Sequence, residues 1–181
     1  MRKLLFAILF VLAAVPVAAQ TVTTIHLTGV PDVVCDEVWQ QDGVDMYFTT
    51  STDADCDGGG HCGFEVGETS VYLYGSRLVA DFGQSYQVTR IEIDVVDYCG
   101  TGCTNAFVYN QGELVATTHN TTSGDPEVLV LEMADKGLPF QADKLAISSC
   151  EGEVLGSTIR IYADSVGNED RPWTSVKGDY R

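Results

Sequence analysis

Apolar and polar residues alternate along several short stretches of this chain, and this two-residue period limits the possible folds more than any other feature. Ile91, Ile93 and Val95 alternate with charged residues, and Ile159 and Ile161 alternate with polar ones. Such alternation is typical of strands with one buried and one solvated face. The same pattern and residue preferences predict further strands at 23–27, 45–50, 69–74, 78–82, 105–109, 114–118, 127–133 and 144–149.

Turn-forming residues separate these stretches at regular intervals, as in Asp42-Gly43 and Asn110-Gln111-Gly112. About ten short strands separated by such turns are typical of a two-layer sandwich or a barrel. No stretch has a convincing helical period, because the best candidate, 134–142, contains Gly137 and Pro139. We therefore predict an all-β fold, a two-layer antiparallel β-sandwich.

The first nineteen residues have the layout of a secretory signal. Arg2 and Lys3 precede an apolar run, and small residues at 17–19 stand where a signal peptidase cuts. The run falls short of the about 20 residues that a membrane span needs. We expect cleavage after Ala19, a secreted or periplasmic product and no membrane insertion after cleavage, with an uncleaved anchor as the alternative.

Cleavage leaves 162 residues (181 minus 19), enough for one domain with a sizeable core. We place that domain at 20–162 and expect the polar tail at 163–181 to be mobile, unless Trp173 packs back onto the sandwich. The net charge of −16 includes Arg2 and Lys3, so the mature chain carries −18. Such an acidic surface repels phosphate backbones and anionic lipids, which argues against nucleic acid and membrane surfaces as partners. The sequence leaves the oligomeric state open.

All six cysteines lie in the predicted mature chain, and an even count behind a signal predicts disulfides. Six cysteines allow 15 pairings. Proximity along the chain favours Cys56 with Cys62 and Cys99 with Cys103, which leaves Cys35 and Cys150 as a long-range pair. A zinc site is disfavoured, because no two pairs of cysteines have metal-ligand spacing.

The segment around residue 55 carries carboxylates at alternate positions, followed by glycine. Asp53, Asp55 and Asp57, with Glu65 further on, could turn their oxygens toward a hard cation such as Ca²⁺. The spacing departs from an EF-hand loop, because the twelfth position is Phe64. We expect a structural calcium loop here, and a solvated acidic loop without metal is the alternative.

Several segments resemble those of a known superfamily. Leu78-Val79-Ala80-Asp81-Phe82-Gly83, followed by Val88-Thr89-Arg90-Ile91-Glu92-Ile93, resembles the central strands of galactose-binding-like jelly-roll sandwiches. That superfamily includes discoidin-type domains and many carbohydrate-binding modules. The segments 98–109, 144–150 and 158–162 are similar to a loop and later strands of secreted bacterial relatives. The resemblance covers about half of the mature chain and implies a jelly-roll topology.

The resemblance also implies ligand binding by loops at one end of the sandwich or by a sheet face. Sugars need aromatic platforms with hydrogen-bonding side chains beside them. Candidates for such a site are Trp39, Tyr98, Tyr109, Asp97 and Asn105. The alternative for each aromatic residue is packing in the core or across strands.

Catalysis has little support in the sequence, which contains neither G-x-S-x-G nor H-E-x-x-H. We therefore expect a non-catalytic binding domain that recognises a glycan or another cell-surface ligand. The alternative is a structural or adhesive surface protein that contacts another protein and has no small-ligand site.

Overall fold

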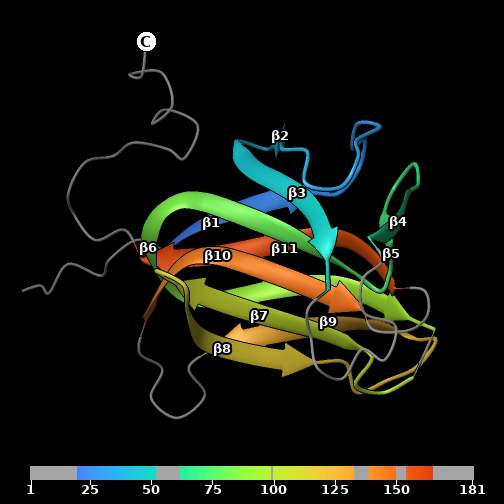
Figure 1. Ribbon diagram of the computed structural model, residues 1–181. Coiled ribbons are helices and arrows are strands. Elements are labelled where there is room, and N and C mark those ends of the chain that lie inside the picture. Colours follow the sequence, from blue (N-terminus) through green and yellow to red (C-terminus); the bar gives the residue numbers. More distant parts are fainter. Residues whose placement is uncertain (1–19, 52–61, 99, 133–138, 150–153, 165–181) are drawn as a thin grey trace, which may run out of the picture.

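The computed structural model describes residues 20–51, 62–98, 100–132, 139–149 and 154–164 (Figure 1). These residues form eleven strands and no helix, so no helix in this part of the chain is long and apolar enough to cross a membrane. Every ladder between them is antiparallel. The strands are β1 (Gln20–His26), β2 (Trp39–Gln41), β3 (Val44–Thr50), β4 (Gly63–Val66), β5 (Val71–Tyr74), β6 (Ser76–Asp97), β7 (Thr104–Asn110), β8 (Glu113–His119), β9 (Pro126–Glu132), β10 (Phe140–Ser149) and β11 (Val154–Asp164).

Two layers share the long strand β6. The first sheet has the order β2-β3-β6-β10-β7-β8 and uses the beginning of β6. The second sheet has the order β4-β5-β11-β6-β9, uses the end of β6, and carries β1 on β11. Figure 1 shows β10, β7 and β8 in one layer, with β9 and β11 behind them. The predicted all-β antiparallel sandwich is confirmed.

The sequence pattern predicts two strands around Gly83, and this prediction is wrong, because β6 runs through it without a break. Gly83 has a φ of +72°, which lets the strand bend. Its N–H donates a hydrogen bond to Oδ1 of Asp81 at 2.9 Å. Strand β10 follows β6 around the bend, and a register shift between Ala142 and Lys144 takes up the difference. The bend therefore passes β6 from one layer to the other.

The core lies between the layers and is built from the alternate residues that the sequence marks as apolar. Ile91, Ile93 and Val95 on β6 and Ile159 and Ile161 on β11 are all buried. From the first sheet, β3, β6, β10 and β7 contribute side chains to the same cluster. Burial of these side chains removes apolar area from water, which is the main term that favours this fold. The largest fully buried side chains are Phe48, Ile25, Leu27, Met46, Leu73, Leu78, Ile91, Ile93, Leu129, Leu131, Leu145 and Ile159.

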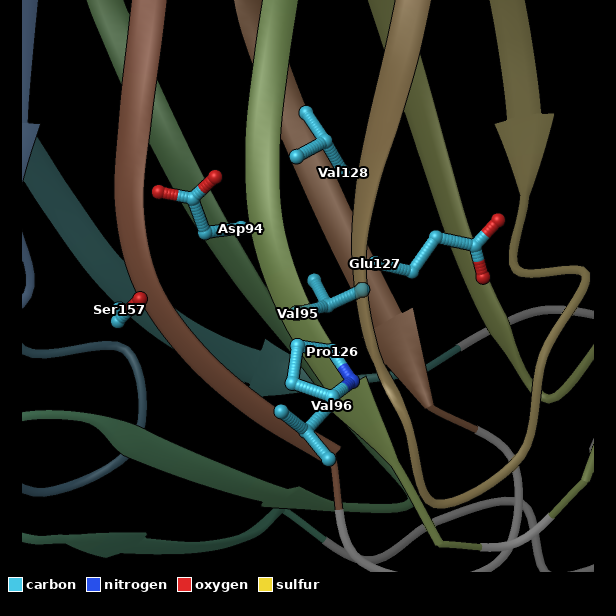
Figure 2. A pocket seen from close by; sticks show the side chains of 7 residues that line it. All are labelled: Asp94, Val95, Val96, Pro126, Glu127, Val128 and Ser157. Atoms are coloured by element: carbon cyan, nitrogen blue, oxygen red, sulfur yellow. The ribbon is translucent and has the colours of Figure 1, made fainter.

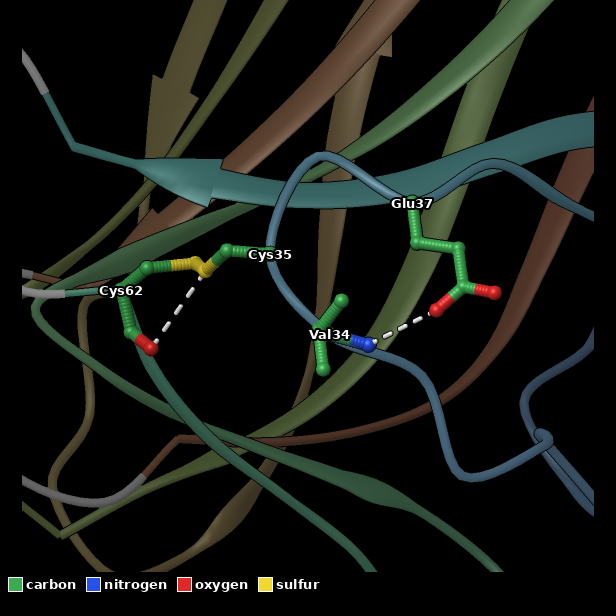
Figure 3. The surroundings of a disulfide bond; sticks show 4 residues. All are labelled: Val34, Cys35, Glu37 and Cys62. Carbon is green, nitrogen blue, oxygen red and sulfur yellow. Dashed lines mark hydrogen bonds between the residues drawn. A yellow bond between two sulfur atoms is a disulfide. The ribbon is translucent and has the colours of Figure 1, made fainter.

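A disulfide joins Cys35 to Cys62, with their Cα atoms 6.2 Å apart (Figure 3). This pairing overturns two predictions, Cys35 with Cys150 and Cys56 with Cys62. The reason lies in packing rather than in chain proximity. The N–H of Asp36 donates to the carbonyl of Phe48 at 2.7 Å, and Phe64 stacks on Phe48 with ring centroids 3.8 Å apart. Both contacts bring Cys35 and the start of β4 to the same place.

Cys103 is also disulfide-bonded. Its predicted partner, Cys99, lies outside the described residues, as do Cys56 and Cys150. The pairing of Cys99 with Cys103 therefore stays a prediction.

Candidate ligand-binding face

The outer face of the first sheet presents the residues that alternate with the core. One row crosses five strands in register: Tyr47 on β3, Val79 on β6, Ala146 on β10, Phe107 on β7 and Thr117 on β8. Directly paired residues of neighbouring antiparallel strands lie on one face, so these side chains are neighbours. The short side chains of Val79 and Ala146 stand between the Tyr47 and Phe107 positions and are buried. The row therefore has an aromatic ring on each side and only short side chains between the two rings.

Two more rows flank this one, each two residues further along the strands, except on β8, where a register shift places Leu114 three residues from Thr117. They extend the face with charged, polar and aromatic side chains. In the order β3, β6, β10, β7 and β8 they are Thr49, Arg77, Ser148, Asn105 and His119, and then Asp45, Asp81, Lys144, Tyr109 and Leu114. We call these three rows the polar–aromatic face.

The rings of Phe107 and Tyr109 lie 6.5 Å apart along β7, tilted by 32°. The guanidinium carbon of Arg77 lies 5.3 Å from the centroid of the Phe107 ring. A cation over an aromatic ring is attracted by the electrons of the ring. Arg77 is therefore positioned beside the aromatic row and carries up to five N–H donors at that point.

Lys144 links the third row to the first. Its Nζ lies 3.4 Å from Oδ2 of Asp81, and it also interacts with the hydroxyl of Tyr47. Burial lowers the pKa of Lys144, but Tyr47 and Asp81 outweigh this effect and raise the pKa above its ordinary value. The ammonium therefore stays charged at neutral pH and holds Tyr47 and Asp81 together.

The charges on the polar–aromatic face balance. Arg77 and Lys144 are opposed by Asp45 and Asp81, which are paired across β3 and β6. The other two cations within the described ranges, Arg90 and Arg160, belong to the second sheet. The face can thus donate and accept hydrogen bonds without a strong field of either sign.

Four of the five residues predicted to bind ligand fall into two groups. Asn105 and Tyr109 lie on the polar–aromatic face. Tyr98 is 56% exposed and follows the end of β6, next to Asp97, which is only 2% exposed. The structure brings Asn105 and Tyr109 together on one strand and leaves Tyr98 in the loop beyond β6.

Trp39, the fifth, belongs to the core. It is 7% exposed, and its ring centroid lies 5.0 Å from that of Phe48. Because it pairs with Met46 rather than with an outward residue of β3, it faces the layer between the sheets. We do not include Trp39 in the candidate site.

Asp97 holds the loop between β6 and β7. Its carboxylate accepts hydrogen bonds from Oγ1 of Thr104 at 2.5 Å and from the N–H of Gly100 at 3.4 Å. Its carbonyl accepts from the N–H of Gly124 at 2.5 Å. A buried carboxylate with such donors positions the segment that carries Tyr98, so we assign Asp97 a supporting role.

The residues of the polar–aromatic face that were not predicted from the sequence include its main aromatic and cationic side chains, Tyr47, Arg77, Phe107 and Lys144. The available signal was their place on the polar side of expected strands, or one residue before a strand in the case of Arg77. That signal does not say which strands are neighbours. Only the order β3-β6-β10-β7 brings these four together.

Of the four predicted calcium ligands, Asp53, Asp55 and Asp57 lie outside the described residues. Glu65 is exposed on β4, where its Oε2 accepts a hydrogen bond from the hydroxyl of Tyr74 at 3.3 Å. Within the part of the chain that the structure describes, no three His, Cys, Asp or Glu side chains gather as a metal-binding group.

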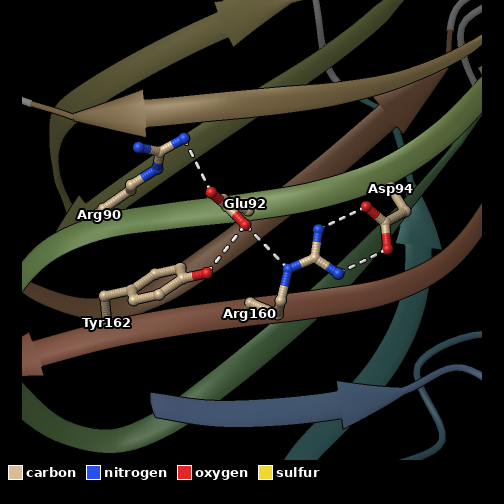
Figure 4. A network of polar contacts seen from close by, with 5 residues as sticks. All are labelled: Arg90, Glu92, Asp94, Arg160 and Tyr162. Carbon is tan, nitrogen blue, oxygen red and sulfur yellow. Dashed lines mark hydrogen bonds and ion pairs between the residues drawn. The ribbon is translucent and has the colours of Figure 1, made fainter. Parts of the chain in front are cut away.

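The outer face of the second sheet carries an ion-pair network (Figure 4). Arg160 donates from Nη1 and Nη2 to the two oxygens of Asp94 at 2.7 and 2.5 Å, and from Nε to Glu92 at 2.8 Å. The hydrogen bonds to Asp94 and Glu92 raise the pKa of Arg160, and the hydrogen bond from Arg160 lowers the pKa of Glu92. The network ties β11 to β6 and uses all three nitrogens of the Arg160 guanidinium.

Comparison with known proteins places this geometry in a known fold. No family model matches the chain, and no curated protein matches it either. Solved structures do. A single-residue mutant of the family 29 carbohydrate-binding module CBM29-2 aligns with 80% of this chain and 92% of its own, at 14% identity and a TM-score of 0.51.

A second structure, described as a family 29 carbohydrate-binding module, aligns with 80% of this chain and 89% of its own, at 11% identity and a TM-score of 0.50. At such identities the likeness establishes the fold alone. The sequence resemblance to the galactose-binding-like superfamily is thereby confirmed at the level of fold. The chain therefore shares the β-sandwich fold of these family 29 carbohydrate-binding modules.

Proposed function

We propose that this protein is a non-catalytic carbohydrate-binding domain and that it binds a neutral glycan on the polar–aromatic face. The observation that carries the proposal is the row in which the rings of Tyr47 and Phe107 flank two short side chains. The apolar face of a sugar ring packs on aromatic rings, and its hydroxyls pair with the side chains around them. The fold shared with family 29 carbohydrate-binding modules supports the proposal.

The balance of charge points to a neutral ligand rather than an anionic one. Lys144 and Asp81 form one donor–acceptor pair beside the rings, and Arg77 supplies further donors. Sugar hydroxyls both donate and accept, so a mixed set of fixed groups suits them. A polyanionic glycan would meet Asp45 and Asp81 on the same face and a strongly acidic chain beyond it.

The proposal includes a location and a metal. A secreted or periplasmic domain agrees with the predicted signal at 1–19 and with the disulfide of Cys35 and Cys62. We also propose that Asp53, Asp55, Asp57 and Glu65 hold a structural Ca²⁺. Melting with and without millimolar Ca²⁺ tests this, and an unchanged melting temperature in the oxidised protein rejects the metal.

A glycan array tests the function itself. The oxidised mature protein is applied with calcium and with chelator, next to the variants Phe107→Ala and Val22→Ala. Val22 is an exposed residue of the second sheet and serves as the matched control. We expect at least one neutral glycan to retain the wild type and the control, and to retain Phe107→Ala more weakly.

Binding that depends on calcium would connect the acidic loop to recognition, and binding without calcium would leave the loop a scaffold role. If the wild type binds none of the glycans, the proposal is rejected. Such a result would favour the alternative of a structural or adhesive domain that contacts another protein.

A further inference from the structure

The outer face of the second sheet contains a pocket of its own, on the side of the sandwich opposite the polar–aromatic face. Its volume is about 220 Å³, and Figure 2 shows its lining side chains. Val96, Pro126 and Val128 give it apolar walls, while Asp94 and Ser157 add polar groups. This volume lies below the about 300–1,000 Å³ of pockets for drug-sized ligands, so it suits a single small ring.

An irregularity in β11 places the polar side of the pocket. The pairing of β11 with β6 shifts between Gly156 and Thr158, which leaves Ser157 as the extra residue of a bulge beside Asp94. The Asp94 carboxylate is held by the two nitrogens of Arg160. A carboxylate has about four acceptor positions, so Asp94 can still accept from a ligand while Arg160 fixes its orientation.

The pocket continues into a row across the second sheet. Glu65 pairs with Tyr72 across β4 and β5, and Val96 pairs with Pro126 across β6 and β9. The backbone of residue 155 on β11 pairs with Tyr72 on one side and with Val96 on the other, so the two pairs are in register. Four steps between strands of about 4.8 Å each make this row about 19 Å long. It is therefore long enough for a short oligosaccharide whose terminal ring occupies the pocket.

Tyr72, near the other end of the row, has a second tyrosine beside it on the same strand. The rings of Tyr72 and Tyr74 on β5 are nearly parallel, with an angle of 7° and centroids 6.5 Å apart. Glu65 accepts a hydrogen bond from the Tyr74 hydroxyl. Gly67 leaves room beside Tyr72, because a Cβ there would stand 3.3 Å from Cε2 of that ring.

We propose that this row is a second glycan site, which makes the domain bivalent, with one site on each sheet. The inference rests on the proposed function, because it assigns the same ligand class, a neutral glycan, to a second surface. A sugar ring in the pocket places its C–H face on Val96, Pro126 and Val128, and its hydroxyls reach Asp94 and Ser157. The glycan chain then crosses β11 toward Tyr72.

The test uses the full mature protein with the first site removed. The ¹⁵N-labelled variant Phe107→Ala is titrated with hexasaccharides of β-1,4-linked glucose, mannose and xylose, and amide shifts are recorded. The wild type should show two groups of shifts, around Phe107 and around Val96 and Ser157. Phe107→Ala should keep only the second group.

The changes Val128→Asp and Val22→Asp, each made on Phe107→Ala, separate the pocket from general surface charge. Both valines are exposed on edge strands of the second sheet, at 44% and 51%, and only Val128 lines the pocket. Val128→Asp should abolish the remaining shifts, and Val22→Asp should keep them.

If the amide shifts of the wild type change only around Phe107, the second site is overturned and the proposed function stands. Equal loss in both aspartate variants also overturns it. If no amide shift of the wild type changes, both the second site and the proposed function are overturned.

Discussion

Asn120 gives the sharpest test of how the fold holds the loop beside the candidate site. It follows β8, is 1% exposed, and its side chain makes three hydrogen bonds. Oδ1 accepts from the N–H of Thr104 at 3.0 Å, and Nδ2 donates to the carbonyls of Gly100 and Thr122 at 2.6 and 2.7 Å. The change Asn120→Ala removes all three bonds and leaves their partners without this side chain.

Each such bond contributes about 0.5–1.5 kcal/mol net, and an unsatisfied buried partner costs more. We therefore expect Asn120→Ala to lower the free energy of unfolding by about 3 kcal/mol. At about 2–4 °C per kcal/mol for a chain of this size, the melting temperature should fall by about 6–12 °C. Circular dichroism melts of the oxidised protein measure this.

The matched control is Asn110→Ala, which removes the side-chain oxygen that accepts from Ser85 at an exposed position. Its effect should stay within about 0.5 kcal/mol, as for most surface changes. If Asn120→Ala melts within about 2 °C of the wild type, the side chain does not hold this loop and the reasoning is refuted.

Further predictions follow from the same contacts. Because Asn120 is enclosed by its hydrogen bonds, protein secreted by a eukaryotic host should carry no glycan at the Asn120-Thr121-Thr122 sequon, and a glycan mass on folded protein would contradict this. Burial would raise the pKa of Glu127, but hydrogen bonds from Thr121 and Thr122 outweigh it and lower that pKa below 4.5. The stability that Glu127 contributes is therefore full above pH 4.5 and is lost as the pH falls through the lowered pKa, so Glu127→Gln should be less stable at pH 7 and approach the wild type by pH 3 in melts. Removal of the disulfide by Cys35→Ala with Cys62→Ala frees a loop with a sequence separation of 27 and should cost about 3–4 kcal/mol in urea unfolding; an unchanged midpoint would reject it.

The sequence was informative about strands because burial of one face leaves a two-residue period. The predicted strands at 105–109, 114–118 and 144–149 correspond to β7, β8 and β10. The short strands β2 and β4 were missed, because three or four residues are too few to establish a period. The continuity of β6 was missed because Gly83 is also a turn former.

The site was harder to predict because it depends on which strands are neighbours. Tyr47 and Phe107 are 60 positions apart in the numbering and meet only through β6 and β10. The disulfide shows the same limit, since Cys35 meets Cys62 through the stacking of Phe48 on Phe64. The local pattern thus predicts the strands, and tertiary packing decides which of their side chains become neighbours.

Isothermal titration calorimetry of the mature protein with the best-binding neutral hexasaccharide tests the central claim most directly. Phe107→Ala and Tyr47→Ala should each weaken binding at the polar–aromatic face at least about tenfold, equivalent to about 1.4 kcal/mol. Val22→Ala, which lies on the other sheet, should leave it unchanged. Wild-type affinity at that face in both aromatic variants, with melting temperatures intact, would contradict the account.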